Sequence, residues 1–178
     1  MPQAFLVLDV NNDIVNAKGR GAAMGVPDQA AARGTAAKVK AAVAAARAAG
    51  DRVVWAYPGP KVSEAFGMPP SDAWGIEIDP DWGVPAADET VYVKTAISAM
   101  TGTDMESDLK AMGVDTVLVC GVVTSYVVVS TAAEALERGF SVKVLEDCCS
   151  DMSDEGHAAA IAGLPEGVEV TESSKIWS

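Results

Sequence analysis

Histidine and cysteine are scarce in this chain of 178 residues, which has one histidine, His157, and three cysteines. Zinc clusters usually draw their ligands from these two residue types, so His157 cannot anchor a cluster of the usual kind. Three cysteines is an odd number, and the adjacent Cys148 and Cys149 have poor geometry for a conventional disulfide. We therefore predict free thiols in a reducing compartment, no metal and no other cofactor.

Long apolar runs and basic residues are also lacking. The apolar runs are no longer than a strand and fall far short of the ~20 residues that span a bilayer. Residues 1–4 contain no basic residue of the kind that begins a secretory signal. The formal net charge of −12 repels phosphate backbones. These features predict a cytoplasmic protein without a membrane or nucleic-acid partner, and the length predicts one domain over residues 1–178.

Apolar segments of strand length alternate with helical patterns along the chain. The predicted strands are residues 4–10, 52–57, 90–94, 116–120, 141–145 and 168–170, and the predicted helices are residues 29–49, 104–112, 125–138 and 153–164. Residues 17–27 and 58–88 are rich in glycine and proline, and they are predicted to be irregular loops. This alternation predicts a doubly wound three-layer α/β/α sandwich with a mainly parallel six-stranded sheet in the order 3-2-1-4-5-6.

Polar residues at strand ends mark a candidate site. Gly121 permits a sharp turn after the buried strand 116–120, and Thr124 or Ser125 can cap the helix that follows. Asp9 ends the first strand and Lys94 ends the third. Because the carboxyl ends of parallel strands meet at one edge of a sheet, we expect Asp9, Lys94 and this turn to face one crevice.

The same segments resemble a known family, the isochorismatase-like cysteine hydrolases. Residues 121–128 read Gly-Val-Val-Thr-Ser-Tyr-Val-Val and residues 130–135 read Ser-Thr-Ala-Ala-Glu-Ala, similar to the nucleophile segment of that family. Residues 6–13, Leu-Val-Leu-Asp-Val-Asn-Asn-Asp, and residues 93–104, Val-Lys-Thr-Ala-Ile-Ser-Ala-Met-Thr-Gly-Thr-Asp, match two further motifs. Its C-terminal pattern is matched by Asp147, Ser153 and His157. The resemblance covers nearly the whole chain except residues 58–88.

The resemblance implies roles for particular residues. Asp9 is the expected acid/base, and Lys94 is expected to hold the charge of Asp9 and of the substrate. A cis peptide bond is expected at Val122–Val123, with the amides of Val123 and Val127 lining an oxyanion pocket, which needs only backbone donors. The nucleophile position of the family is occupied here by Val127, which has no lone pair and cannot form a thioester.

Several other reactive side chains have simpler explanations. Cys120 is typical of a buried core thiol, and Cys148 and Cys149 are expected near the rim of the crevice without a catalytic role. His157 is expected to cap or pack against its own helix.

An aspartate and three tryptophans are further candidates for the site. Asp13 resembles a residue that assists a metal in the nicotinamidase subgroup, but the histidine ligands of that subgroup are missing, so no metal site is predicted. Trp55, Trp74 and Trp82 are interpreted either as walls of the pocket or as core and surface packing, and the sequence leaves both open.

The sequence is compatible with two functions. The first is a hydrolase that lacks the cysteine and uses Asp9 on a small carboxylated or enol-ether substrate. Within the resembling family, the true isochorismatases also lack the cysteine and hydrolyse a vinyl ether by protonating it from an aspartate. The alternative is a catalytically degenerate member that binds a small ligand or a protein. In either case we expect a homodimer or a higher homo-oligomer.

Overall fold

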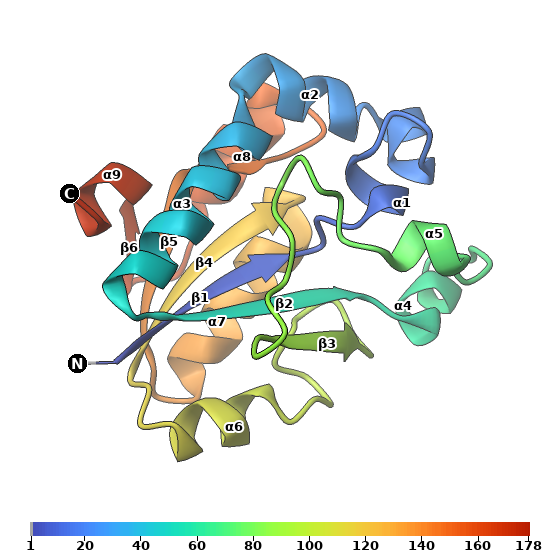
Figure 1. The fold of residues 1–178 in the computed structure, drawn as a ribbon. Coiled ribbons are helices and arrows are strands. Elements are labelled where there is room, and N and C mark those ends of the chain that lie inside the picture. The colour runs from blue at the N-terminus through green and yellow to red at the C-terminus, as the bar shows by residue number, and fades with distance from the viewer. Residues whose placement is uncertain (1) are drawn as a thin grey trace.

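The sheet of this protein is built from six parallel strands. The structure is a computed structural model that describes residues 2–178. Its strands are β1 (Gln3–Leu8), β2 (Arg52–Pro58), β3 (Thr90–Lys94), β4 (Thr116–Val122), β5 (Ser141–Ser150) and β6 (Val168–Thr171). Their order is β3-β2-β1-β4-β5-β6, and each pair of neighbours is parallel (Figure 1). The predicted α/β architecture and strand order are confirmed.

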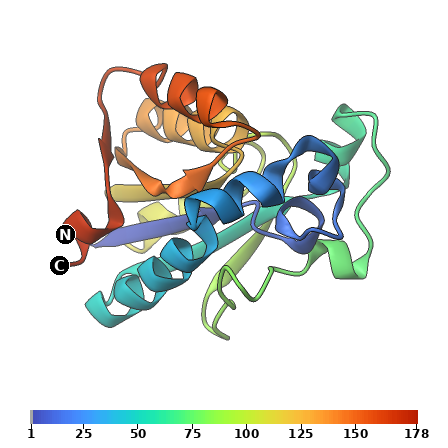
Figure 2. The ribbon, with the colours of Figure 1, turned by 90° about the horizontal axis from the view of Figure 1, so that it is seen from above.

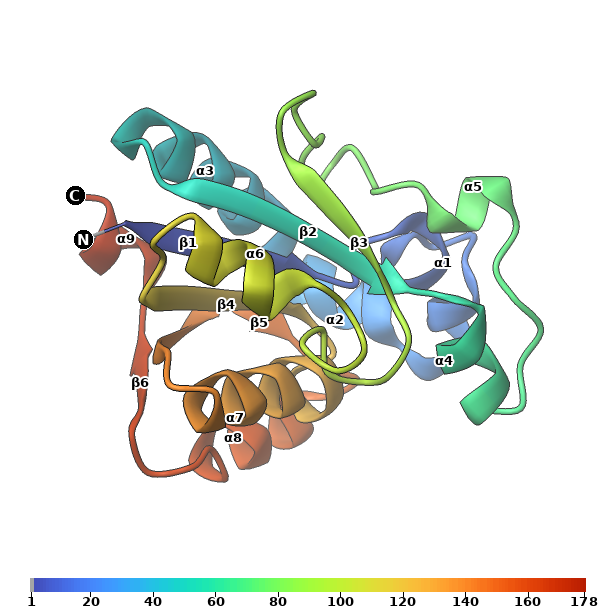
Figure 3. The same ribbon diagram turned by 90° about the horizontal axis from the view of Figure 1, so that it is seen from below.

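Helices cover both faces of this sheet. They are α1 (Asn12–Val15), η1 (Arg20–Met24), α2 (Val26–Arg33), α3 (Thr35–Ala49), α4 (Pro60–Ala65), α5 (Ala73–Ile76), α6 (Met105–Ala111), η2 (Thr124–Val128), α7 (Val129–Glu137), α8 (Asp154–Ala162) and α9 (Ser173–Ile176). Helix α3 packs on one face against β1, β2 and β5, and α7 packs on the other face against β4, β5 and β6 (Figures 2 and 3). The chain therefore forms three layers.

Three local predictions differ from the structure. The single helix expected over residues 29–49 is broken at Gly34, whose φ of 65° is left-handed, into α2 and α3. The stretch 58–88 contains the short helices α4 and α5, and residues 17–27 contain η1. Strand β5 runs to Ser150 rather than ending at residue 145, because it stays paired with the last residues of β4 beyond an irregularity in register.

The centre of the sheet is entirely buried. Residues 4–8 of β1 and residues 117–121 of β4 have no or almost no exposed surface, which suits the continuous apolar runs of a strand covered on both faces. All three cysteines are buried in this core as free thiols. In the described part of the chain, no helix is long and apolar enough to cross a membrane.

Gly121 is required where β1 and β4 approach each other. Its φ is 137°, and a Cβ atom built there would lie 2.1 Å from the carbonyl oxygen of Leu8. No other residue type fits this conformation and this space. The sheet order reverses between these two strands, so their carboxyl ends open a crevice at this point. Helices α1, α4 and α5 gather at this edge of the sheet (Figure 1).

Candidate functional site

A buried ion pair joins the ends of two strands that are not neighbours. Asp9 follows β1, Lys94 ends β3, and the Lys94 Nζ lies 2.7 Å from the Asp9 Oδ2. Lys94 is 1% exposed and Asp9 8%. The Lys94 Nζ also donates to the Ile97 carbonyl at 2.8 Å. The lysine stem thus spans the width of β2 and brings its charge to the carboxylate.

The backbone of Asp9 is held in an uncommon conformation. Its φ is 57°, in the left-handed region, which costs a non-glycine residue on the order of 1 kcal/mol. Its N–H donates to the Ala56 carbonyl at 2.9 Å, which fixes this turn at the end of β1. Aspartate is among the residues that enter this region most readily. The strain therefore falls on a residue of the candidate site.

The environment of Asp9 raises the pKa of its carboxyl group toward neutral pH. Burial raises the pKa of Asp9 to about 6, although the charge and the hydrogen bond of Lys94 pull it the other way. The Asp9 Oδ1 is buried and has no hydrogen-bond partner among the described residues. A carboxyl group with a pKa near the operating pH is suited to general acid or base catalysis. Because Lys94 occupies Oδ2, Oδ1 is the oxygen left to carry the proton.

A cavity of about 130 Å³ opens beside this pair. The structure places all five sequence-derived site residues in its wall, namely Asp9, Lys94, Val122, Val123 and Val127. The remaining walls are mainly apolar, and they are formed by Ile14, Gly21, Met24, Val26, Pro58, Val62, Phe66, Met68, Ile97, Tyr126 and Met152, with Arg20, Ser63 and Ser71 as polar members.

The turn after β4 leads into a π-helical segment. The Val122–Val123 peptide bond is cis, as the resemblance implies. The segment η2 follows, and it runs directly into α7. Val127 is 1% exposed and lines the cavity, and the resemblance assigns the cysteine of the family to this position.

The expected helix capping by Thr124 or Ser125 is wrong. The Ser125 N–H donates to the Asp151 Oδ2 at 2.6 Å, so the capping carboxylate comes from the residue after β5. The Thr124 hydroxyl instead donates to the Ser150 carbonyl at 3.0 Å. Both bonds tie the turn to the end of β5, which the pairing with β4 extends past residue 145.

His157 takes part in the same attachment and does not cap its own helix. Its Nδ1 lies 2.9 Å from the Thr124 Oγ1, and its Nε2 lies 3.0 Å from an Arg33 nitrogen. Since the one hydroxyl proton of Thr124 goes to Ser150, Nδ1–H is the donor and Nε2 accepts from the guanidinium. Burial and the neighbouring Arg33 lower the pKa of His157, so it is a neutral tether of the turn.

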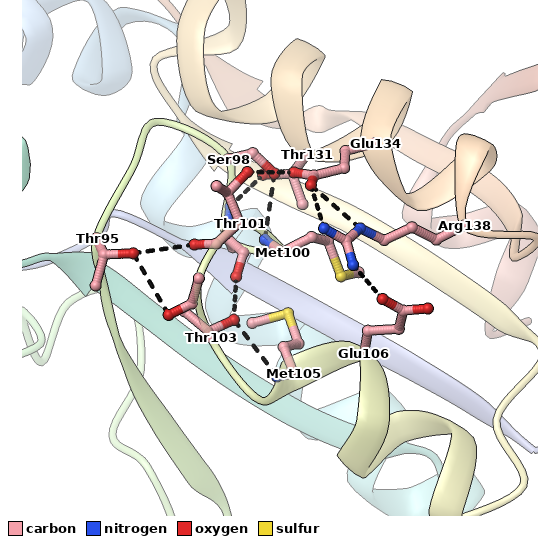
Figure 4. Close-up of polar contacts among 12 residues, drawn as sticks. Thr95, Ser98, Met100, Thr101, Thr103, Met105, Glu106, Thr131, Glu134 and Arg138 are labelled. Carbon is pink, nitrogen blue, oxygen red and sulfur yellow. Dashed lines mark hydrogen bonds and ion pairs between the residues drawn. The ribbon is translucent and has the colours of Figure 1, made fainter.

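A polar network fixes the loop that carries the Ile97 carbonyl (Figure 4). The Thr131 Oγ1 of α7 accepts from the Ala99 N–H at 3.0 Å, and the Thr101 hydroxyl donates to the Glu134 Oε2 at 2.7 Å. Arg138 then joins Glu134 to Glu106 of α6. These contacts anchor the loop after β3 to the helix after β4, so they also fix the position of the Lys94 amine.

The remaining candidates lie outside the cavity wall. Cys148 and Cys149 are fully buried in β5, so the expectation that they lie at the rim is wrong. Burial raises the thiol pKa of all three cysteines, that of Cys149 to about 12, which leaves them as unreactive thiols. Asp147, matched to the family pattern, instead accepts hydrogen bonds from the backbone N–H and the hydroxyl of Ser173 in α9.

The tryptophans and Asp13 also lie outside the cavity wall. Trp55 and Trp82 are buried in the core and Trp74 is partly exposed, and none of them lines the cavity, so packing is the correct interpretation. Asp13 is engaged by Arg20 and by the Ser71 hydroxyl. Within residues 2–178, no group of three or more acidic, histidine or cysteine side chains is arranged to hold a metal ion.

Comparison with known proteins places this site in a family. The family model described as "Isochorismatase domain" matches residues 3–175. The chain belongs to the isochorismatase family. An uncharacterized isochorismatase family protein, YwoC, from Bacillus subtilis (strain 168) is 39% identical over 95 residues, which are 53% of this chain and 49% of that protein. Maleamate amidohydrolase from Pseudomonas putida is 36% identical over 75 residues, which are 42% and 35% of the two chains. The chain thus spans about half the length, or less, of the curated relatives that it matches.

Solved structures of the family match over nearly the full chain. An isochorismatase-like hydrolase from Alkaliphilus metalliredigens superposes with a TM-score of 0.84 at 24% identity, covering 99% of this chain and 97% of that one. N-carbamoylsarcosine amidase from Thermoplasma acidophilum superposes with a TM-score of 0.77 at 27% identity, covering 97% of each chain. The family and structural neighbours are hydrolases of the isochorismatase-like superfamily.

Sequence reasoning missed several residues that shape this family member's site. Asp151 directly follows β5, which is a usual position for a site residue, but the sequence pattern predicts the end of that strand at residue 145 and so gives no signal for it. Phe66 and Met68 lie in the irregular stretch 58–88, where no periodic pattern reports burial. Arg20, in the predicted glycine-rich loop, had no signal that would place it at the cavity.

Proposed function

We propose that this chain is an isochorismatase-family hydrolase that works without a covalent cysteine intermediate. Asp9 acts as the acid/base on a small enol-ether or carboxylated substrate bound in the cavity. The observation that supports this most is the buried Asp9–Lys94 pair in a cavity wall that contains no cysteine. A carboxyl group with a pKa of about 6 can give or take a proton at physiological pH.

The proposed reaction needs one proton and one water molecule. Protonated Asp9 donates its Oδ1 proton to the enol-ether carbon, and the C=C electron pair forms the new C–H bond. The resulting oxocarbenium ion is captured by water, which returns a proton to the Asp9 carboxylate. The hemiketal then releases an alcohol and leaves a ketone or aldehyde. Substrate and water are consumed and the carboxyl group is restored.

In this proposal the other site residues orient Asp9 and the substrate and exchange no proton themselves. Lys94 holds the Asp9 Oδ2 and keeps the proton on the other oxygen. Val122, Val123 and Val127 line the cavity, and we assign to their backbone the contact with the oxygen of the departing alcohol, which gains electron density as the hemiketal breaks down. Val127 adds an apolar wall where a thiol would permit acyl transfer.

One observation supports the alternative of a binding module. The cavity wall contains no cysteine, and the hydroxyl of Ser71 in that wall is already committed to Asp13. If hydrolysis has been lost, the same cavity binds a small ligand or a protein side chain. The survival of a buried, strained Asp9 beside Lys94 argues against this reading, because such a pair is costly to keep without a use.

A panel of substrates separates the two functions. The purified protein is incubated with enol ethers, with and without a carboxylate, and with primary amides of similar size, and release of carbonyl product or ammonia is measured. We expect carbonyl release from an enol ether, no ammonia, and a loss of at least about 100-fold in Asp9→Asn. Asp115→Asn, at the amino end of β4, is the matched control and should retain full activity.

The same assay can contradict the proposed function. Turnover that survives in Asp9→Asn, or that is abolished by thiol alkylation, contradicts the proposed chemistry. Absence of any turnover, together with tight binding of a panel member, supports the binding module.

A further inference from the structure

The mouth of the cavity is an exposed apolar rim. Its side chains are Met24, Phe66, Tyr126 and Met152, with exposed fractions of 46%, 49%, 44% and 36%. Phe66 at the end of α4 and Tyr126 of η2 meet edge to face, with ring centroids 6.1 Å apart. Large apolar side chains that stay this exposed around one opening mark a ligand-binding surface. Methionines on such a surface adapt to ligands of different shape.

The charges at the cavity are already compensated from within the protein. The wall carries Asp9, Lys94 and Arg20 as charged residues, and Lys94 is paired with Asp9. Arg20 donates from Nε to the Asp13 Oδ2 at 2.6 Å, and its terminal nitrogens donate to the Pro69 carbonyl and the Ser71 hydroxyl. Above the Asp9 pKa of about 6, where this carboxyl group is ionised, both cations of the wall have an anionic partner, and no net positive charge remains to receive a carboxylate.

Asp13 is firmly ionised in this arrangement. Burial alone would raise its pKa, but the hydrogen bonds from Arg20 and Ser71 outweigh burial and hold the pKa below its usual value. The Arg20–Asp13 pair is thus neutral as a unit over the physiological pH range. A substrate carboxylate entering the cavity would lose its hydration without gaining an unpaired cation, and that exchange is unfavourable.

The size of the cavity limits the body of the ligand. Its volume is about 130 Å³, and a dry apolar cavity of roughly 150 Å³ holds benzene. One six-membered ring therefore fits inside, and a substituent can extend past the rim. The unpartnered Asp9 Oδ1 adds one acceptor at the inner end, which suits a ligand with a hydroxyl or amide N–H.

We infer that this cavity selects an uncharged substrate with an apolar, ring-sized body and one hydrogen-bond donor, and that it discriminates against carboxylates. The inference rests on the proposed function only in taking this cavity as the substrate site. Of the two substrate types proposed above, it selects the uncharged enol ether. The apolar rim holds the body of the ligand, and the Asp9 carboxylate receives the polar end.

Binding of matched probes tests the inference without any turnover. Benzamide and benzoate share a ring and differ in charge, and acetamide has the polar group without the ring. Affinities are measured at pH 7.5 by calorimetry or ligand-observed NMR on the full chain. We expect benzamide to bind at least about tenfold more tightly than either benzoate or acetamide. Benzoate binding as tightly as benzamide, or no binding of benzamide, overturns the inference.

Two variants test the charge compensation of Arg20 and the contribution of the apolar rim. Asp13→Asn removes the partner of Arg20, so benzoate affinity should rise several-fold while benzamide affinity stays the same. Phe66→Ala, at a half-exposed position that folding should tolerate, should weaken benzamide several-fold and leave acetamide unchanged. Val84→Ala, an exposed apolar residue outside the cavity wall, is the matched control and should change neither.

The outcomes distinguish this inference from the proposed function. Equal losses in Phe66→Ala and Val84→Ala, or a folded Asp13→Asn with unchanged benzoate affinity, would refute the selection rule. Selective benzamide binding in a protein that hydrolyses no enol ether would uphold the rule and remove the proposed reaction. Turnover of a carboxylated enol ether together with strong benzoate binding would uphold the proposed reaction and refute the selection rule.

Discussion

Replacing Lys94 by methionine tests the buried ion pair directly. Methionine keeps most of the lysine stem but removes the charge, so the Asp9 carboxylate loses its partner 2.7 Å away. Removing one member of a buried pair typically costs about 3–5 kcal/mol, because the other charge is left without compensation. A domain of this size has a total stability of roughly 5–15 kcal/mol, so the variant should fold with a greatly reduced margin.

The cost should depend on pH in a defined direction. The folded pKa of Asp9, about 6, is above its unfolded value of 3.8, so Asp9 favours folding at low pH and this contribution is lost as pH rises through 6. Both influences that lower this pKa come from Lys94, so Lys94→Met raises it further. Relative to the unchanged protein, the variant is therefore destabilised more at pH 8, where its Asp9 resists ionisation, than at pH 5, where Asp9 is protonated in both.

Urea denaturation at pH 5 and pH 8 measures both effects. Asp9→Asn and the double variant Asp9→Asn/Lys94→Met complete a cycle, and the double variant should lose less than the sum of the single variants, by at least about 2 kcal/mol. Strictly additive losses, or a cost of Lys94→Met that is the same at both pH values, would refute the argument that these two charges compensate each other.

Three further outcomes follow from the same site. If Asp9 is the acid, kcat/KM for an enol ether should fall about tenfold per pH unit above roughly pH 6, and a rate that rises through this range would show that the ionised form is required. Val127→Cys changes the side-chain volume little, so it should lower the free energy of unfolding by under about 1.5 kcal/mol. A stoichiometric acyl burst of this variant with an activated ester would show that only the nucleophile is missing. A folded but unreactive variant would show that the acid/base is not placed for that chemistry. Glu134→Ala should release the loop held at Thr101 and lower kcat at least several-fold with a shifted pH profile, whereas unchanged kinetics would show that this network does not position Lys94.

The sequence by itself determined the layers, the strand order and the chemistry available at the strand ends. Continuous apolar runs at residues 4–8 and 117–120 indicate strands buried on both faces, and alternation with helices leaves few ways to connect them. Asp9 was recognisable because it is a charged residue directly after such a run, and Lys94 because it is a charged residue at the end of a β-branched segment of strand length. Gly121 was recognisable as a special backbone position, but the turn expected there is wrong, because β4 continues through it to Val122.

Local helix details were less accessible from sequence. The alanine-rich pattern over residues 29–49 continues through Gly34 without a change in period, so only the left-handed φ of that glycine reveals the break. Thr124 and Ser125 are good caps by residue type. Their capping role was taken by Asp151, because the longer β5 brings this carboxylate to the turn.

Only the tertiary structure decided which groups meet. Lys94 reaches Asp9 across the intervening β2, Phe66 meets Tyr126 across 60 positions of sequence, and Arg20 is neutralised at the cavity wall by Asp13. Hydrophobic periodicity reports whether a residue is buried, but it carries no information on which distant residue lies beside it. Burial and pairing together set the pKa of Asp9 and the charge of the cavity, so the substrate preference proposed here depends on contacts that no local pattern records.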